Sequence, residues 1–337
     1  MRALPVAGLL DGPTPVQPLA DGVFVKRDDL SAADYGGNKI RKLDLLLAAA
    51  RARGAAEVLT FGYAGSNFVA ATAWHGRKLG LSTLAYLLPQ VNAHYVADNL
   101  SVGLHAGAEL HLRDSEAAIA RSALLRSAVR LLRRGRLPAW IPPGGSSPLG
   151  AVGFVNAALE LRAQVDAGEL PVPERIYVAF SSMGTVAGLA LGLELAGLPS
   201  RIMAVRVVDP HFAAPEKLRK LVRETRRLLT RHERRLTPDI ERALARVQVR
   251  AEFFGEAYGV PTAATQAAID RFTRASAARA DTAYSGKALA CLYHDLDAGQ
   301  LRGGTALFWH TYNAHGLPPQ VPRLTRDRVP EALRSYF

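Results

Sequence analysis

Lys39 directly follows the sequence Tyr-Gly-Gly-Asn at positions 35–38. The two glycines permit backbone conformations that a side chain would forbid, and Asn38 is a favourable residue to begin a helix. Apolar residues then recur at helical spacing, which predicts a helix over residues 39–53 with Lys39 in its first turn. An ammonium group is disfavoured there because the positive end of the helix dipole lies at the N-terminus. Lys39 is therefore either a simply solvated side chain or an uncharged amine that serves chemistry.

Lys42 adds a second positive charge on the same helix face, one turn further along. Two ammonium groups at this spacing repel each other unless one is neutralised or an anion lies between them. A lysine that forms an imine next to a phosphate group would satisfy both conditions.

A second candidate site follows an expected strand at residues 175–180 and precedes an expected helix at residues 186–196. Backbone N–H groups at such a strand-to-helix turn point outward and, with the helix dipole, form an anion site. An ordinary N-capped helix is the alternative explanation. The turn consists of Ser181, Ser182, Met183, Gly184 and Thr185.

Several short segments occur in an order that is typical of one enzyme family. They are Lys26–Leu30, Gly36–Lys39, Arg41–Leu43, Gly65–Asn67, Ile141–Gly145, Gly184–Leu189, Tyr258–Pro261 and Tyr284–Ala288. In this set the chain resembles the pyridoxal-phosphate enzymes grouped as 1-aminocyclopropane-1-carboxylate deaminases and D-cysteine desulfhydrases. The resemblance implies a two-domain α/β fold like that of tryptophan synthase β (fold type II), with parallel sheets flanked by helices. It also implies a large cofactor-binding domain of residues 1–52 and 156–337 and a small domain of residues 53–155.

The same resemblance implies roles for individual residues. Lys39 would be the Schiff-base lysine for pyridoxal 5'-phosphate, and Lys42 would lie near the phosphate. Asn67 would hydrogen-bond the ring hydroxyl, while Ser66 would hold the substrate carboxylate. Tyr258 and Tyr284 match the two active-site tyrosines of the family. The phosphate would rest in the turn of Ser181, Ser182, Met183, Gly184 and Thr185, where the family usually has more glycine.

Two further positions bear on the reaction. Where a cyclopropane deaminase would have a glutamate near the pyridine nitrogen, this chain offers the hydroxyls of Ser285 or Thr311. A carboxylate would keep that nitrogen protonated and strengthen the electron sink, whereas a hydroxyl suits the loss of a β substituent. The family's His-Thr-Gly-Gly is His-Thr-Tyr-Asn here, so Tyr312 and Asn313 add bulk and polarity in place of two glycines.

These features predict a lyase that acts on a small amino acid. The favoured reaction is D-cysteine desulfhydrase-like α,β-elimination, which gives a 2-oxo acid, ammonia and a thiol or sulfide. The alternatives are deamination of 1-aminocyclopropane-1-carboxylate, a specialised β-replacement or racemisation, and a cofactor-binding homologue without turnover. Relatives in the family suggest a homodimer with a role in amino-acid metabolism.

The elements expected to position these residues alternate along the chain. Strands are expected at 22–26, 57–61, 82–87, 109–112, 175–180, 201–208, 248–254 and 305–309. Helices are expected at 67–79, 95–106, 116–133, 153–167, 186–196, 262–275 and 287–298. Such alternation predicts parallel sheets covered by helices, preceded by a proline-rich lead-in at residues 5–18.

The composition is that of an ordinary soluble enzyme, with 42 Lys and Arg against 30 Asp and Glu and a net charge of +12. The single cysteine, Cys291, excludes an internal disulfide and fits a reducing compartment, so a cytoplasmic location is expected. No segment has the length of a membrane span, and no metal-ligand spacing stands out. Basic residues crowd positions 217–235, but leucines recur among them, which predicts an amphipathic helix rather than a specific nucleic-acid site.

Overall fold

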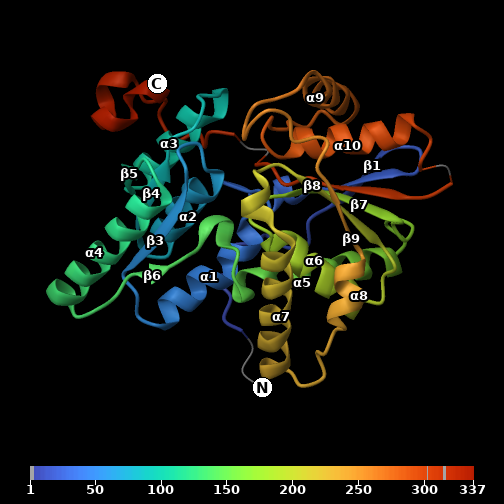
Figure 1. Cartoon of the computed structure of the whole chain (residues 1–337), viewed down its shortest axis with the longest axis horizontal. Coiled ribbons are helices and arrows are strands. Elements are labelled where there is room, and N and C mark those ends of the chain that lie inside the picture. Colours follow the sequence, from blue (N-terminus) through green and yellow to red (C-terminus); the bar gives the residue numbers. More distant parts are fainter. Residues whose placement is uncertain (1–3, 302, 314–315) are drawn as a thin grey trace. The chain divides into compact units, whose positions relative to one another are not determined.

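The computed structural model describes residues 4–301, 303–313 and 316–337 (Figure 1). The chain forms two compact units. The first includes Leu10–Lys42 and the chain that begins again at Ser146, and the second includes Pro5–Leu9, Leu43–Gly145 and the C-terminal segment. Helix α1 (Ile40–Ala52) begins in the first unit and continues into the second.

The first unit is built on a six-stranded sheet. Its strands, in spatial order, are β1 (Val16–Ala20), β2 (Val23–Lys26), β10 (Ala306–Trp309), β7 (Arg175–Phe180), β8 (Arg201–Arg206) and β9 (Val247–Arg250). Only the β1–β2 pair is antiparallel, and the other neighbours are parallel. The carboxyl ends of the parallel strands therefore meet at one edge, where ligands bind in open α/β sheets.

Helices cover both faces of this sheet. They are α5 (Pro148–Asp166), α6 (Gly184–Leu195), α7 (Pro215–His232), α8 (Ile240–Ala245), α9 (Ala263–Ser276) and α10 (Ser285–Asp297). Figure 1 shows α9 and α10 on one face and α5 to α8 on the other. The α9–α10 side is a continuous apolar core in which Val25, Phe272, Leu292 and Phe308 are buried together.

The second unit contains a smaller parallel sheet. Its strands, in spatial order, are β5 (Glu109–Leu112), β4 (Ser82–Leu88), β3 (Glu57–Tyr63) and β6 (Ala139–Trp140). Its helices, besides most of α1, are α2 (Asn67–Lys78), α3 (His94–His105) and α4 (Glu116–Arg134). Leu59, Leu84 and Ile119 form part of a core between the sheet and α4.

Short 3-10 helices complete the secondary structure of the described residues. They lie at Asp28–Leu30, Pro143–Gly145, Pro210–Ala213, Arg326–Arg328 and Glu331–Tyr336. No helix in the described part of the chain is long and apolar enough to cross a membrane.

The predicted parallel sheets flanked by helices are confirmed, and three local expectations are corrected. The last residues of the expected lead-in (16–18) belong to strand β1, which continues to Ala20, because Pro18 is tolerated in a strand at the edge of a sheet. Strand β9 ends at Arg250, four residues before the predicted end. Helix α5 begins at Pro148, five residues before the predicted start, because Ser147 caps it and proline suits the first helical position.

A buried ionic network supports the segment that leads to Lys39. The Asp28 carboxylate accepts hydrogen bonds from Arg41 Nη2 at 2.7 Å and from Trp309 Nε1 at 2.7 Å. Arg41 also pairs with Glu160 at 2.9 Å, and Lys26 pairs with the same carboxylate. Burial raises the pKa of Glu160, but hydrogen bonds and charge from Arg41 and Lys26 outweigh it and lower that pKa to about 2. The Glu160 carboxylate is therefore ionised at neutral pH.

Candidate active site

Lys39 lies immediately before α1 and is half-buried. Its helix begins one residue later than predicted, so Lys39 belongs to the preceding turn and not to the first helical turn. The ammonium Nζ donates to Asn38 Oδ1 at 2.8 Å and lies 5.5 Å from the ring centroid of Tyr284. Burial lowers the pKa of Lys39 to about 8, although the carboxylates of Asp281 and Asp28 oppose the shift. A substantial fraction of this amine is therefore neutral near physiological pH.

The glycine loop before Lys39 is fixed by close backbone contacts. A Cβ atom on Gly36 would lie 2.5 Å from the Asp29 carbonyl oxygen, and Gly37 has a φ of +95°. The Gly36 N–H donates to Asn313 Oδ1 at 3.1 Å, and the Asn38 N–H donates to the Thr311 carbonyl at 3.3 Å. The amide oxygen of Asn313 thus binds the backbone of the loop that carries Lys39.

The predicted phosphate turn begins helix α6, and the backbone at Gly184 is closely approached by Ser146 and Lys42. A Cβ atom on Gly184 would lie 2.7 Å from Ser146 Oγ and 3.1 Å from Lys42 Nζ. Ser146 Oγ also accepts from the Gly184 N–H at 3.1 Å and donates to Ser182 Oγ at 2.8 Å. Met183 has a φ of 69°, a conformation that favours glycine.

Lys42 is buried beside this turn. Burial, together with the charge of Lys39, lowers the pKa of Lys42 well below the ordinary lysine range. A bound phosphate would restore the positive charge because it offers an anion within reach of the amine. The donor set of one lysine, a helix N-terminus and several hydroxyls therefore fits a phosphate monoester.

Asn38 connects the lysine segment to the phosphate turn. Its Nδ2 donates to Thr185 Oγ1 at 3.4 Å, while its Oδ1 accepts from Lys39. The first unit thus brings together two lysines and the turn, which lie more than 140 residues apart in the sequence.

Tyr258 and Tyr284, far apart in the sequence, form a hydrogen-bonded pair in the first unit. Their hydroxyl oxygens lie 2.6 Å apart, and their rings meet edge to face with centroids 5.8 Å apart. Both side chains are half-buried. Because one phenol donates to the other, a proton can pass between the two tyrosine hydroxyls.

Asp281 is a buried residue that sequence reasoning missed. Its carboxylate accepts from the backbone N–H groups of Ala283 at 2.9 Å, Tyr284 at 2.6 Å and Ser285 at 3.1 Å, and from the Ser285 hydroxyl. The Ser285 hydroxyl proton is therefore directed to Asp281, and its Oγ in turn accepts from the Asp281 backbone N–H at 2.8 Å. An aspartate just before the predicted helix was the available signal, because acidic residues commonly precede helix starts.

Lys287 binds the segment that leads to Tyr258, and sequence reasoning missed this role as well. This buried ammonium donates to the carbonyl oxygens of Phe254 and Ala257, at the end of the segment that leads to Tyr258. Burial lowers the pKa of Lys287 to about 8.

Ser66 and Asn67 belong to the second unit, whereas the other predicted site residues belong to the first. Ser66 caps α2 by accepting from the Val69 N–H at 3.4 Å. The adjacent Gly65 is held by Gln90, whose Oε1 accepts from its N–H at 2.8 Å, and by Asn99, which donates to its carbonyl at 2.9 Å. The roles expected of Ser66 and Asn67 toward the cofactor and substrate stay predictions.

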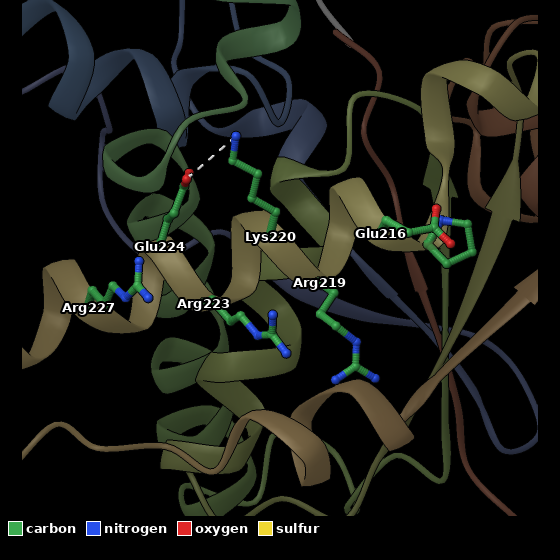
Figure 2. Close-up of a pocket in the computed structure, with 7 residues that line it drawn as sticks. Glu216, Arg219, Lys220, Arg223, Glu224 and Arg227 are labelled. Carbon is green, nitrogen blue, oxygen red and sulfur yellow. Dashed lines mark ion pairs between the residues drawn. The ribbon is translucent and has the colours of Figure 1, made fainter.

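The basic segment forms helix α7 and is amphipathic, as predicted. Leu218, Leu221 and Val222 are buried, while a shallow hollow of about 650 Å³ lies along the outer face (Figure 2). The hollow is lined by Pro215, Glu216, Arg219, Lys220, Arg223, Glu224 and Arg227. Charge on this face is partly compensated, because Arg219 pairs with Glu241 and Lys220 with Glu224.

The described residues contain no cluster of metal-binding side chains.

A half-buried lysine that is linked through Asn38 to a helix start fitted for phosphate, in a fold of parallel strands and helices, is typical of enzymes that use pyridoxal phosphate. Residues 8–311 match the family described as pyridoxal-phosphate dependent enzyme, and this chain belongs to that family. It is an enzyme of fold type II with pyridoxal phosphate as its cofactor. The predictions of family, fold class, enzyme class and cofactor are confirmed.

Three relatives show how broad the similarity is. The chain is 39% identical over 318 residues to nocardicin C-9' epimerase of Nocardia uniformis subsp. tsuyamanensis, which covers 92% of this chain and 93% of that protein. It is 32% identical over 330 residues to a putative 1-aminocyclopropane-1-carboxylate deaminase of Pyrococcus horikoshii, covering 94% of each. The crystal structure of an ACC deaminase homologue superposes with a TM-score of 0.76 at 31% identity, covering 93% of each chain.

The lowered pKa of Lys39 predicts its reactivity in the cofactor-free protein. Acetylation of this amine, followed by peptide mass spectrometry, should rise with pH around a midpoint of about 8, because only the neutral amine reacts. An ordinary exposed lysine titrates near ~10.4. Asp281 raises the pKa of Lys39, so Asp281→Asn should move the midpoint further down and speed acetylation at pH 7. A midpoint above about 10 in the unchanged protein would contradict the burial argument.

Proposed function

We propose that this enzyme inverts the configuration at Cα of an amino-acid substrate. The observation that carries the proposal is the presence of two distinct proton-carrying groups in the first unit: the Lys39 amine and the Tyr258–Tyr284 hydroxyl pair. Inversion needs a group that removes the Cα proton and a source that returns a proton to the opposite face. The 39% identity to an epimerase supports the same reaction class.

Each proposed role follows from the environment of the residue. Pyridoxal phosphate, when bound, supplies the conjugated ring that spreads the electron pair left at Cα. Lys39 Nζ would remove the Cα proton, since its lowered pKa leaves it neutral enough to act as a base. Lys42, Ser182, Gly184 and Thr185 would hold the phosphate.

The tyrosine pair is proposed to return the proton. The two hydroxyls are hydrogen-bonded to each other. When one phenol gives its proton to Cα, the other can therefore donate a hydrogen bond to the phenolate that is left. Asp281 fixes the backbone of Tyr284, and Lys287 fixes the segment before Tyr258. Ser285 and Thr311 remain the proposed neutral partners of the pyridine nitrogen, a choice that weakens the electron sink and keeps more of the negative charge at Cα, where a proton can be returned.

The second candidate is an ammonia-releasing reaction, which the sequence prediction favoured. It would be α,β-elimination from an amino acid such as D-cysteine, or ring opening of 1-aminocyclopropane-1-carboxylate. The 32% identity to a putative deaminase of the latter kind supports it. Elimination shares the Lys39 step but needs no proton from the tyrosines, because a thiolate leaves unprotonated.

One experiment separates the two candidates. The enzyme loaded with cofactor is incubated in deuterium oxide with single D- and L-amino acids and with the cyclopropane substrate. Inversion predicts deuterium at Cα and the opposite enantiomer on a chiral column, with no ammonia. Release of ammonia with a 2-oxo acid would favour the lyase. If none of the amino acids reacted, a homologue without turnover would be favoured. Tyr284→Phe should lower inversion more than elimination.

We also propose that the protein acts as a homodimer in the cytoplasm. The lone cysteine, Cys291, is buried and fits a reducing compartment. The large domain of residues 1–52 and 156–337 and the small domain of residues 53–155, implied by the family resemblance, are likewise proposed as the functional division of the chain.

A further inference from the structure

The residues that follow strand β10 bind two loops of the candidate site. Thr311 and Asn313 accept hydrogen bonds from the backbone of the loop that carries Lys39. His310, which directly follows β10, binds a different loop, because its Nε2 lies 2.9 Å from the Arg279 carbonyl oxygen. One short segment therefore connects the lysine loop to the loop that begins at Arg279.

His310 is a completely buried side chain in an aromatic cluster. Its ring stacks on Phe308 with centroids 5.4 Å apart and meets Phe272 edge to face at 5.2 Å. Within the described part of the chain, His310 Nδ1 has no hydrogen-bond partner. The partner of Nε2 is a carbonyl, which only accepts, so we assign the ring proton to Nε2. A phenylalanine would fill the same space, and the feature that requires histidine is this donor.

The neighbouring carboxylate does not account for the histidine. Asp29 Oδ2 lies 3.9 Å from His310 Nε2, which is too far for a hydrogen bond. Arg27 already binds both carboxylate oxygens of Asp29, at 2.8 and 2.7 Å. Burial lowers the pKa of His310, although the charge of Asp29 opposes the shift. The imidazole is therefore neutral at physiological pH and acts by donating one hydrogen bond.

Arg279 begins the turn that leads to Tyr284. Two residues further on, the Asp281 carboxylate accepts the three backbone N–H groups of residues 283–285 and makes this turn rigid. The ring centroid of Tyr284 lies 5.5 Å from Lys39 Nζ. A shift of the Arg279 carbonyl would therefore move Asp281 and Tyr284 together, relative to the lysine.

We propose that His310 is a positioning residue, whose hydrogen bond to the Arg279 carbonyl fixes the Tyr284 hydroxyl relative to the Lys39 amine. Its catalytic consequence rests on the function proposed above, whereas its geometry rests on the contacts alone. Inversion at Cα needs both proton-carrying groups in register at one carbon. Exchange of the Cα proton with retention of configuration needs only one of them. Loss of the hydrogen bond should therefore separate the two processes.

Four variants isolate the Nε2 donor. His310→Phe keeps an aromatic ring without the donor, and His310→Asn is a second loss variant because its amide is too short to reach Arg279. His310→Gln is the conservative variant, since its amide N–H lies near the position of the imidazole Nε2. Phe272→Leu is the matched control, because it alters the same aromatic cluster and leaves the donor in place.

The first test uses the cofactor-free protein and does not depend on any reaction. Asp281 raises the pKa of Lys39, so a displaced turn should lower the acetylation midpoint of Lys39 from about 8. We expect a fall of about one pH unit in the Phe and Asn variants at position 310. His310→Gln and Phe272→Leu should keep the original midpoint. An unchanged midpoint in the loss variants, or an equal fall in Phe272→Leu, would overturn the proposal.

The second test uses the cofactor-loaded enzyme in deuterium oxide, with the amino acid that the unchanged enzyme inverts. The ratio of inversion to deuterium exchange with retention should fall by about 10–10²-fold in the loss variants, and His310→Gln should restore it. An equal fall in both processes would indicate a structural role only and overturn the proposal. If the unchanged enzyme inverts no amino acid, the proposed function is wrong, and the acetylation midpoints alone decide whether His310 positions the turn.

Discussion

Replacing Lys39 with alanine is expected to abolish covalent attachment of pyridoxal phosphate. The visible absorbance that the covalently bound cofactor gives should disappear, because Lys39 is the amine that lies beside Asn38 and Tyr284. Turnover should fall by about 10²–10⁴-fold, since the group that moves the Cα proton is lost as well. Absorbance spectra of the purified variant after addition of cofactor measure the first effect.

Lys220→Ala is the matched control for this variant. Lys220 is exposed on the outer face of α7 and lines the hollow in Figure 2, so its loss should leave the spectrum unchanged. Covalent attachment that persists in Lys39→Ala would show that a different lysine forms the bond.

Replacing Asp28 with alanine is expected to lower the free energy of unfolding by about 3–5 kcal/mol. The carboxylate is fully buried and accepts from Arg41, Trp309 and Thr14. Without it, the Arg41 guanidinium loses its main counter-charge and the indole N–H of Trp309 loses its acceptor. Denaturant unfolding followed by circular dichroism measures the change.

Asp166→Ala provides the comparison for Asp28→Ala. Asp166 pairs with Arg162 on the exposed surface of α5, where an ion pair contributes roughly 0–1 kcal/mol. Equal losses of stability in the two variants would contradict the proposed importance of burial.

Much of the fold was predictable because its elements repeat a simple physical pattern. Short β-branched runs such as 175–180 and 201–206 occupy central parallel strands, and amphipathic runs such as 215–232 form the helices between them. Residues 16–20 were not predicted as a strand because proline argues against one, and their pairing partner, β2, had to be known first. Helix α8 was also missed, since six residues carry too little periodicity to be recognised.

Part of the candidate site was predictable because a residue's chemical type is unfavourable at its predicted position in the secondary structure. Lys39, predicted in the first turn of a helix, stood out for that reason. The turn before α6 stood out because it joins a strand to a helix, and the structure brings both into the first unit. Lys287 and Ser146 were missed because each is explained by contacts with backbone groups far along the chain that no local pattern reveals. Asp281 was missed although its contacts are local, with the backbone N–H groups of the next few residues. Asn313 was expected only to add bulk and polarity, but its amide oxygen also accepts a hydrogen bond from the Gly36 N–H.

The left-handed backbone at Met183 has an evolutionary consequence. A β-branched residue at this position would collide with its own main chain, whereas glycine would relax it. Natural variation at position 183 should therefore be confined to unbranched side chains, asparagine and glycine. Within the turn proposed to hold the phosphate, side-chain length at position 183 is therefore a property that can vary while the backbone donors of the turn keep their places.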